Sequence, residues 1–98
     1  MKCHSQKPAC LAELQGGLIV SCQAMYEESP TNSPNILSAI AVAAYRGGAC
    51  GIRANLPENI RAIRSAVPIP IIGLFKDHTP GHEVYITPTF EHARLVAE

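Results

Sequence analysis

Three long polar side chains stand at or next to the ends of three short apolar runs in the sequence. Gln23 closes the first run, Arg53 lies near the end of the second, and Lys76 closes the third. In parallel α/β folds the reacting groups gather at the carboxyl ends of the strands, so these residues are expected at one edge of a sheet. An amide, a guanidinium and an ammonium group together suit a small anionic or polyhydroxylated ligand. A lone lysine at a strand end is more often solvated, but three such side chains at successive strand ends favour a binding site.

The alternation of side chains along a strand assigns each of these residues to one face of the sheet. The predicted inner face carries the three polar residues and their neighbours two positions apart: Ile19, Ser21 and Gln23; Ala49, Gly51 and Arg53; Ile72, Leu74 and Lys76. The opposite face carries apolar side chains that suit packing against helices: Val20, Cys22, Cys50, Ile52, Ile71 and Phe75. This pattern predicts a barrel-like interior that becomes polar only at its rim.

The elements that position these residues alternate between strand-like and helix-like patterns from residue 16 onward, which is typical of βαβ units and a parallel sheet. Ser33 and Pro34 predict the start of the first helix, and the glycines at 47–48 predict its end. Asn55 and Glu58 have the spacing of a capping box for the second helix. The predicted strands cover residues 17–23, 49–54 and 71–76. The predicted helices cover 34–46, about 55 to 67, and about 90 to the end of the chain.

Helical spacing also predicts which side chains face the sheet. They are Ile36, Leu37, Ile40, Ala41 and Ala44 in the first helix, and Ile60, Ile63 and Val67 in the second. A polar loop with His78 and His82, both expected in solvent, leads from the third strand to a short strand-like run at residues 84–87. His92, on the last helix, is expected to be exposed. Asp77 follows Lys76 directly, and we expect it either to hold the amine charged or to face water.

Length and composition restrict the class of protein. Ninety-eight residues fit one domain, and we expect a tail with a short helix over residues 1–15 and a single domain over 16–98. Eight Lys and Arg balance eight Asp and Glu, which argues against a nucleic-acid surface, and the 47% hydrophobic content argues against a disordered chain. No apolar run reaches the ~20 residues of a membrane span, and none resembles a secretory signal, so we expect a cytoplasmic protein.

The chain is also short for the architecture that its pattern predicts. Each βα unit takes roughly thirty residues, so about three units fit, whereas a closed eightfold barrel needs ~250 residues. The last helical pattern reaches Glu98 without a glycine or proline to end it. We therefore expect a fragment whose edge strands and inner face are uncovered, and we expect the isolated chain to aggregate, to self-associate or to be partly disordered.

The four cysteines, Cys3, Cys10, Cys22 and Cys50, match no common metal or disulfide spacing, and we interpret them as free thiols. A metal site built from Cys3, His4 and Cys10 would still need a fourth ligand, so no metal is expected.

Four ordered blocks of this sequence resemble the bacterial N-acetylmannosamine-6-phosphate 2-epimerases. They are residues 16–24, residues 47–49 with 51–55, residues 72–73 ahead of Lys76, and residues 84–89. The resemblance runs from about residue 16 to residue 98, and the ordered spacing makes it more specific than a single glycine motif.

The resemblance implies the N-terminal part, about three βα units, of a TIM (β/α)8 barrel of the ribulose-phosphate-binding type. It also implies an isomerase of amino-sugar catabolism that interconverts N-acetylmannosamine 6-phosphate and N-acetylglucosamine 6-phosphate, with no metal or nucleotide cofactor. By similarity Lys76 is the catalytic lysine, and Gln23 and Arg53 line the sugar site. The implied partner is a small amino-sugar phosphate, with no nucleic acid and no membrane, in a chain that could form a homo-oligomer. The acidic partner and the phosphate ligands of the family belong to later strands, and Asp77 stands where family members often have a basic residue.

The chemistry explains why such a site uses a lysine. Inverting carbon 2 of an aldose removes a weakly acidic proton next to a carbonyl, so the site needs a base and a group that stabilises the enolate-like charge. A lysine is a base only when it is deprotonated, which an apolar barrel mouth and a nearby arginine favour. Two other interpretations stay open: a Schiff-base lysine aldolase acting on a related sugar, and an inactive barrel fragment.

Overall fold

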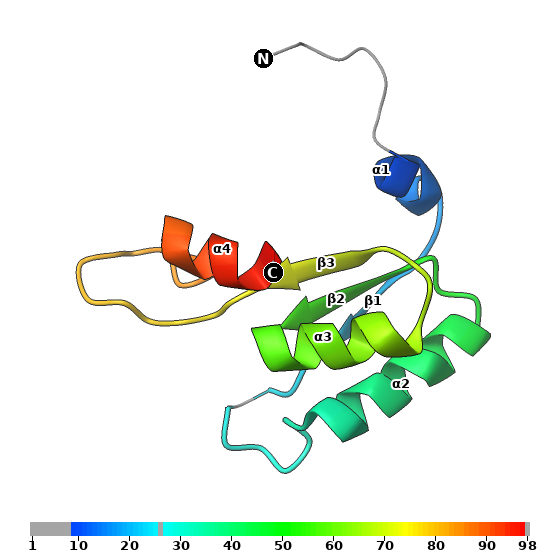
Figure 1. The fold of residues 1–98 in the computed structure, drawn as a ribbon, viewed down its shortest axis with the longest axis horizontal. Coiled ribbons are helices and arrows are strands. Elements are labelled where there is room, and N and C mark those ends of the chain that lie inside the picture. The colour runs from blue at the N-terminus through cyan, green and yellow to red at the C-terminus, as the bar shows by residue number, and fades with distance from the viewer. Residues whose placement is uncertain (1–8, 26, 98) are drawn as a thin grey trace.

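A computed structural model of the chain describes residues 9–25 and 27–97 (Figure 1). Its centre is a three-stranded parallel sheet in the order β1 (Ile19–Cys22), β2 (Gly51–Asn55) and β3 (Ile71–Leu74). The helices are α1 (Ala9–Leu14), α2 (Pro34–Arg46), α3 (Pro57–Ala66) and α4 (Phe90–Ala97). Because one helix follows each strand, the chain forms three successive βα units, as the sequence predicts.

Helices α2, α3 and α4 pack on one face of the sheet (Figure 1). Val20, Ile52 and Ile71 form one register row across the three strands on this face and contact the core. The fully buried cluster consists of Cys22, Leu37, Ala41, Ile52, Ala54, Ile63 and Val67. Burial raises the pKa of the Cys22 thiol, so this side chain stays protonated and packs as a small apolar group.

On the other face of the sheet, the Leu14 side chain of α1 covers Gly51 near the amino ends of the strands. Ser21, Arg53 and Ile72 form a register row on this face, one residue along from the helix-facing row. Ile19 and Ile72 are 39% and 40% exposed, although their side chains are apolar. The assignment of faces from strand alternation is therefore confirmed for the strand residues, and the inner face is partly open to solvent at Ile19 and Ile72.

Helix α2 has the predicted boundaries. Ser33 is extended, Pro34 takes the first helical position, and the Gly47 N–H closes the last turn on the Ala43 carbonyl at 3.0 Å. Gly48 follows with a φ of 107°, a conformation that glycine adopts at little cost. The predicted ending by this glycine pair is confirmed.

The predicted buried face of α2 is only partly right. Leu37 and Ala41 are buried, but Ile36 and Ile40 are 42% and 44% exposed. Each residue of a helix is turned about 100° from its neighbour. A helix that directs Leu37 and Ala41 at the sheet therefore turns the residues just before them toward solvent.

Helix α3 begins later than predicted, and the capping box is wrong. Asn55 is the last residue of β2, and the residue before the helix is Leu56, with a φ of 79°. The Asn55 side chain accepts the backbone N–H of Lys76 instead of capping the helix. The rest of the helix follows the prediction, since Ile63 and Val67 are buried and Ile60 packs against the core.

Strand β3 ends at Leu74, two residues before the predicted end. Residues 75–77 pair with residues 85–87 instead: the Thr87 N–H donates to the Phe75 carbonyl, and the Asp77 N–H to the Tyr85 carbonyl, both at 2.8 Å. The predicted strand at 84–87 is reduced to one antiparallel bridge between Lys76 and Ile86. This pairing folds the chain back beside the end of β3.

Helix α4 covers β3 at a position without a side chain. A Cβ added to Gly73 would lie 2.7 Å from Val96 Cγ1 and 3.0 Å from Ile60 Cδ1. Glycine therefore allows α3 and α4 to approach the strand together.

Helix α1 lies at the other end of the sheet from the carboxyl ends of the strands (Figure 1). The Cys50 thiol contacts the Leu14 carbonyl at 3.7 Å, and the Leu14 side chain covers Gly51. The domain boundary between residues 15 and 16 stays a prediction. Within the part of the chain that the structure describes, no helix is long and apolar enough to cross a membrane.

Candidate active site

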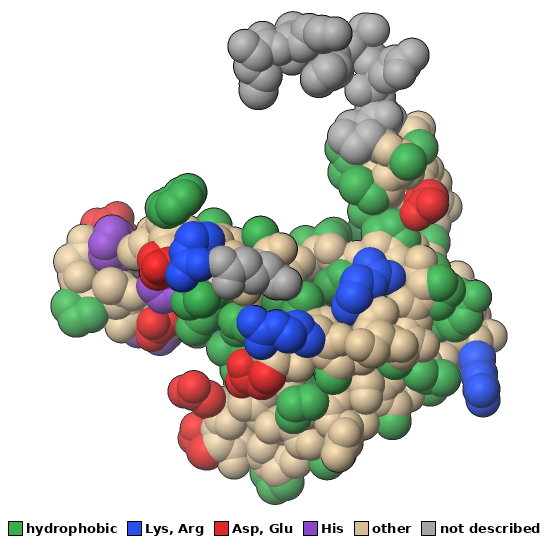
Figure 2. All heavy atoms as spheres, in the orientation of Figure 1, with side chains coloured by type: hydrophobic (Ala, Val, Ile, Leu, Met, Phe, Trp, Pro, Cys, Tyr) green, Lys and Arg blue, Asp and Glu red, His purple; other side chains and the backbone are tan. Residues whose placement is uncertain are grey.

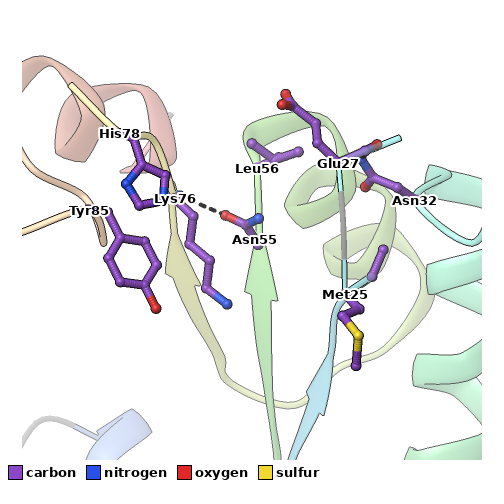
Figure 3. A pocket seen from close by; sticks show the side chains of 9 residues that line it. Met25, Glu27, Asn32, Asn55, Leu56, Lys76, His78 and Tyr85 are labelled. Carbon is purple, nitrogen blue, oxygen red and sulfur yellow. Dashed lines mark hydrogen bonds between the residues drawn. The ribbon is translucent and has the colours of Figure 1, made fainter. Parts of the chain in front are cut away.

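A cavity of about 300 Å³ opens at the carboxyl ends of the three strands. Its lining comes from the segments after β1, at the end of β2 and after β3: Ala24, Met25, Glu27, Asn32, Asn55, Leu56, Lys76, His78 and Tyr85 (Figure 3). This is the edge at which parallel α/β sheets bind their ligands.

Lys76 is fixed in the cavity by contacts of its backbone. Its N–H donates to Asn55 Oδ1 at 2.8 Å, and the bridge to Ile86 holds its other side. The side chain is half-buried and lines the cavity (Figure 3). The backbone of Lys76 is therefore tied both to Asn55 at the end of β2 and to Ile86.

Two asparagines, Asn32 and Asn55, line the cavity, and the buried Asn59 joins them from behind. Asn59, only 2% exposed, donates from Nδ2 to Asn32 Oδ1 at 3.0 Å and to the Asn55 carbonyl at 3.1 Å. Asn32 in turn donates to the Glu27 carbonyl at 2.7 Å. These bonds join the loop after β1 to the end of β2, so two of the three lining segments are held together.

Two aromatic rings stand on the side of Lys76 away from Asn55. His78 and Tyr85 stack with centroids 4.8 Å apart and planes 10° from parallel. The prediction that His78 is a solvated loop residue is right about its exposure, but its ring packs on Tyr85 and lines the cavity.

Asp77 binds a histidine of α4. Its Oδ2 lies 3.0 Å from His92 Nε2, and the Thr89 hydroxyl lies 2.5 Å from His92 Nδ1. The His92 side chain is 14% exposed and meets the Phe75 ring edge-on at 4.7 Å, so the expectation that it is exposed is wrong. The physical reason is that α4 packs beside the end of β3, where the His92 ring contacts Phe75 and Asp77.

Gln23 and Arg53 lie beside the cavity and not in its lining. Gln23 donates from Nε2 to Ser21 Oγ at 2.7 Å, and Ser21 is the register partner of Arg53. Both side chains belong to the inner face, which Lys76 continues two residues beyond Leu74. The structure therefore places the three residues on one side of the sheet, with only Lys76 in the cavity itself.

Sequence reasoning missed Asn55, Tyr85 and the role of His78. Asn55 shares its face with Arg53, so strand alternation extended by two residues would have found it. His78 and Tyr85 are seven residues apart, and only the antiparallel turn after Lys76 brings the two rings together.

Charged side chains are mixed on the face shown in Figure 2, with blue and red side chains interspersed and the histidines gathered at the end that holds α4. Among residues 9–25 and 27–97 no three His, Cys, Asp or Glu residues are grouped to hold a metal. Cys10, Cys22 and Cys50 are free thiols, whereas Cys3 and His4 of the considered metal site lie outside the described residues.

The family profile described as "Putative N-acetylmannosamine-6-phosphate epimerase" matches residues 37–98. The chain belongs to this family. Curated relatives that bear the corresponding 2-epimerase name include a protein of Listeria monocytogenes serotype 4b (strain F2365), 48% identical over 88 residues, and one of Synechococcus elongatus, 53% identical over 88 residues. The matches cover 90% and 89% of this chain and 38% of each relative.

A solved structure of the family shows the same arrangement of elements. The N-acetylmannosamine-6-phosphate 2-epimerase from Clostridium perfringens matches with a TM-score of 0.84 and 36% sequence identity, over 97% of this chain and 41% of that chain. The three βα units are thus part of a TIM barrel, as predicted. The chain spans about two fifths of the length of the family members that it matches.

Proposed function

We propose that this chain acts on N-acetylmannosamine 6-phosphate and interconverts it with N-acetylglucosamine 6-phosphate by moving the proton on carbon 2. The observation that carries the proposal is the position of Lys76, in a cavity at the carboxyl ends of parallel strands in a chain of the epimerase family.

The reaction needs few groups. The neutral amine of Lys76 takes the carbon 2 proton, and the electron pair of the broken C–H bond moves toward carbon 1 and its oxygen as an enolate. A water molecule then protonates the enolate on the opposite face of carbon 2, and the hydroxide that remains takes the proton from the Lys76 ammonium, so the epimer forms and the amine is neutral again. Arg53 and Gln23 orient the sugar from the inner face, and the guanidinium favours the developing negative charge.

A sugar phosphate is an intracellular metabolite, and free thiols are typical of a reducing compartment, so cytoplasmic localisation accompanies this function. The balanced charge supports a small-molecule partner and no nucleic acid. Self-association into a homo-oligomer is part of the proposal because the inner face carries exposed apolar side chains.

The decisive experiment follows the carbon 2 proton by NMR in deuterated water, with the 98-residue chain and N-acetylmannosamine 6-phosphate. We expect exchange of that proton in the unaltered chain and a loss of at least ~100-fold in Lys76→Arg, because arginine keeps the charge but does not act as a base. Arg61→Ala, on α3 outside this cavity, serves as the control and retains the exchange. Undiminished exchange in Lys76→Arg, or reduction of a sugar adduct onto Lys76 by borohydride, contradicts proton transfer by this amine.

A further inference from the structure

The ring pair of His78 and Tyr85 has no part in the proton transfer just described. Both rings line the same cavity as Lys76 and stack on each other. The Asp77 N–H bond to the Tyr85 carbonyl, with the adjoining Lys76–Ile86 bridge, fixes the backbone that holds them. The rings therefore form a preformed aromatic wall of the cavity that the Lys76 side chain also lines.

Asn55 flanks the lysine on the other side. Its Oδ1 accepts the Lys76 N–H, and its Nδ2 has no partner among the described residues. Figure 3 shows the Tyr85 ring and the Lys76 side chain extending in the same direction, with Asn55 across from them. The Lys76 side chain thus begins beside the Asn55 amide and shares its cavity with the aromatic pair.

The chemistry of the substrate matches this arrangement. A base that removes the carbon 2 proton must approach to within about 3 Å, so every substituent of carbon 2 lies beside Lys76. In an amino sugar that substituent is the acetamido group, which ends in an apolar methyl and carries a carbonyl acceptor. A methyl group packs favourably on aromatic rings, and a carbonyl accepts a hydrogen bond from an amide.

We propose that His78 and Tyr85 form the wall that selects the acetamido group, with Asn55 Nδ2 donating to its carbonyl. This inference rests on the proposed function and adds to it the residues that determine substrate specificity. The pair selects a 2-acetamido sugar phosphate over the same sugar phosphate with a hydroxyl at carbon 2.

The test measures the affinity of the 98-residue chain for two probes, N-acetylmannosamine 6-phosphate and mannose 6-phosphate, by titration and by saturation transfer to the acetamido methyl in NMR. The unaltered chain is expected to bind the acetamido sugar more tightly than mannose 6-phosphate. In the double variant His78→Ala with Tyr85→Ala, the ratio of the two affinities is expected to fall about tenfold and the saturation-transfer signal of the methyl group to disappear. Tyr85→Phe keeps the ring and retains the preference. Tyr45→Ala removes a tyrosine of nearly equal exposure, 41% against 42%, from α2 and leaves both affinities unchanged.

Two results would contradict the specificity proposal. One is equal affinity of the unaltered chain for both probes; the other is an unchanged preference for the acetamido sugar in a double variant whose denaturation midpoint is also unchanged. The carbon 2 exchange experiment separates this outcome from failure of the proposed function. If carbon 2 exchanges but the chain does not prefer the acetamido sugar, the specificity proposal is wrong and the proposed function stands. If the preference depends on the two rings but carbon 2 does not exchange, the proposed function is wrong and the rings still form a binding site.

Discussion

Asn59 is a buried polar residue that joins two of the segments lining the cavity. Its amide nitrogen serves two acceptors in different segments, while its Oδ1 is buried without a partner among the described residues. A buried donor that serves two acceptors stabilises both segments. Loss of that donor leaves the two acceptors buried without a hydrogen bond, which costs free energy. This residue therefore links the stability of α3 to the geometry of the site.

Replacing Asn59 by Leu tests this link. We expect Asn59→Leu to lower the free energy of unfolding by ~1–3 kcal/mol, because Asn32 Oδ1 and the Asn55 carbonyl lose their donor. Urea denaturation followed by circular dichroism provides the measurement. Asn35→Leu, at an exposed position of α2, is the matched control and stays near the parent value. Equal midpoints for the two variants would show that the asparagine network contributes nothing to stability.

The site residues differ in how far the sequence alone could place them. Lys76, Arg53 and Gln23 follow from strand periodicity, and the structure pairs Arg53 with Ser21, to which Gln23 donates, whereas Lys76 lies two residues beyond β3. The local spacing of Asn55 and Glu58 favours a helix cap, whereas in the structure the Asn55 side chain accepts the N–H of Lys76, a residue 21 positions along the chain. Their roles as catalytic and sugar-binding residues stay predictions.

At the scale of elements, the contact between α4 and β3 depends on the missing side chain of Gly73. Val96 and Ile60 both occupy the space that a larger residue would take. The position of α4 matters to the site because His92, on that helix, binds Asp77 next to Lys76.

Gly73→Val should therefore force α4 away from β3. We expect a loss of ~1–3 kcal/mol in the free energy of unfolding, typical of overpacked positions, and faster amide exchange along α4. Gly47→Ala is the control, since its φ of −79° suits alanine and the added Cβ meets only atoms at 3.4 Å. Unaltered exchange along α4 in Gly73→Val would contradict close packing at this point.

Element boundaries were less predictable than the elements themselves. All three βα units follow from the sequence, but both β1 and β3 are shorter than their apolar runs. The apolar residues beyond the end of β3 hydrogen-bond to a later segment of the chain instead of continuing the sheet, since residues 75–77 pair with residues 85–87. Such long-range pairing leaves no local signal in the chain.

At the scale of the whole molecule, the sheet has two faces of opposite character. One is covered by helices, and the other exposes Ile19 and Ile72 around Arg53. Within the described residues, the outer edges of β1 and β3 also lack strand partners. Open edges and exposed apolar side chains favour association with other strands.

We therefore expect the 98-residue chain to sediment as species larger than its 10.5 kDa monomer, in a concentration-dependent manner. Ile72→Lys should shift the distribution toward the monomer, because a charge on the inner face opposes burial there. Ile36→Lys, with a similar exposed fraction on α2, leaves the distribution unchanged. A monodisperse monomer of the unaltered chain over the concentration range would contradict self-association through the inner face.

The hydrogen bond from the Lys76 N–H to Asn55 Oδ1 separates the lysine from the turn that follows it. The backbone of Lys76 is anchored on a neighbouring strand, so residues 78–84 can change in sequence or length without moving the amine. The aromatic wall can then diversify in the turn while the anchored lysine is kept.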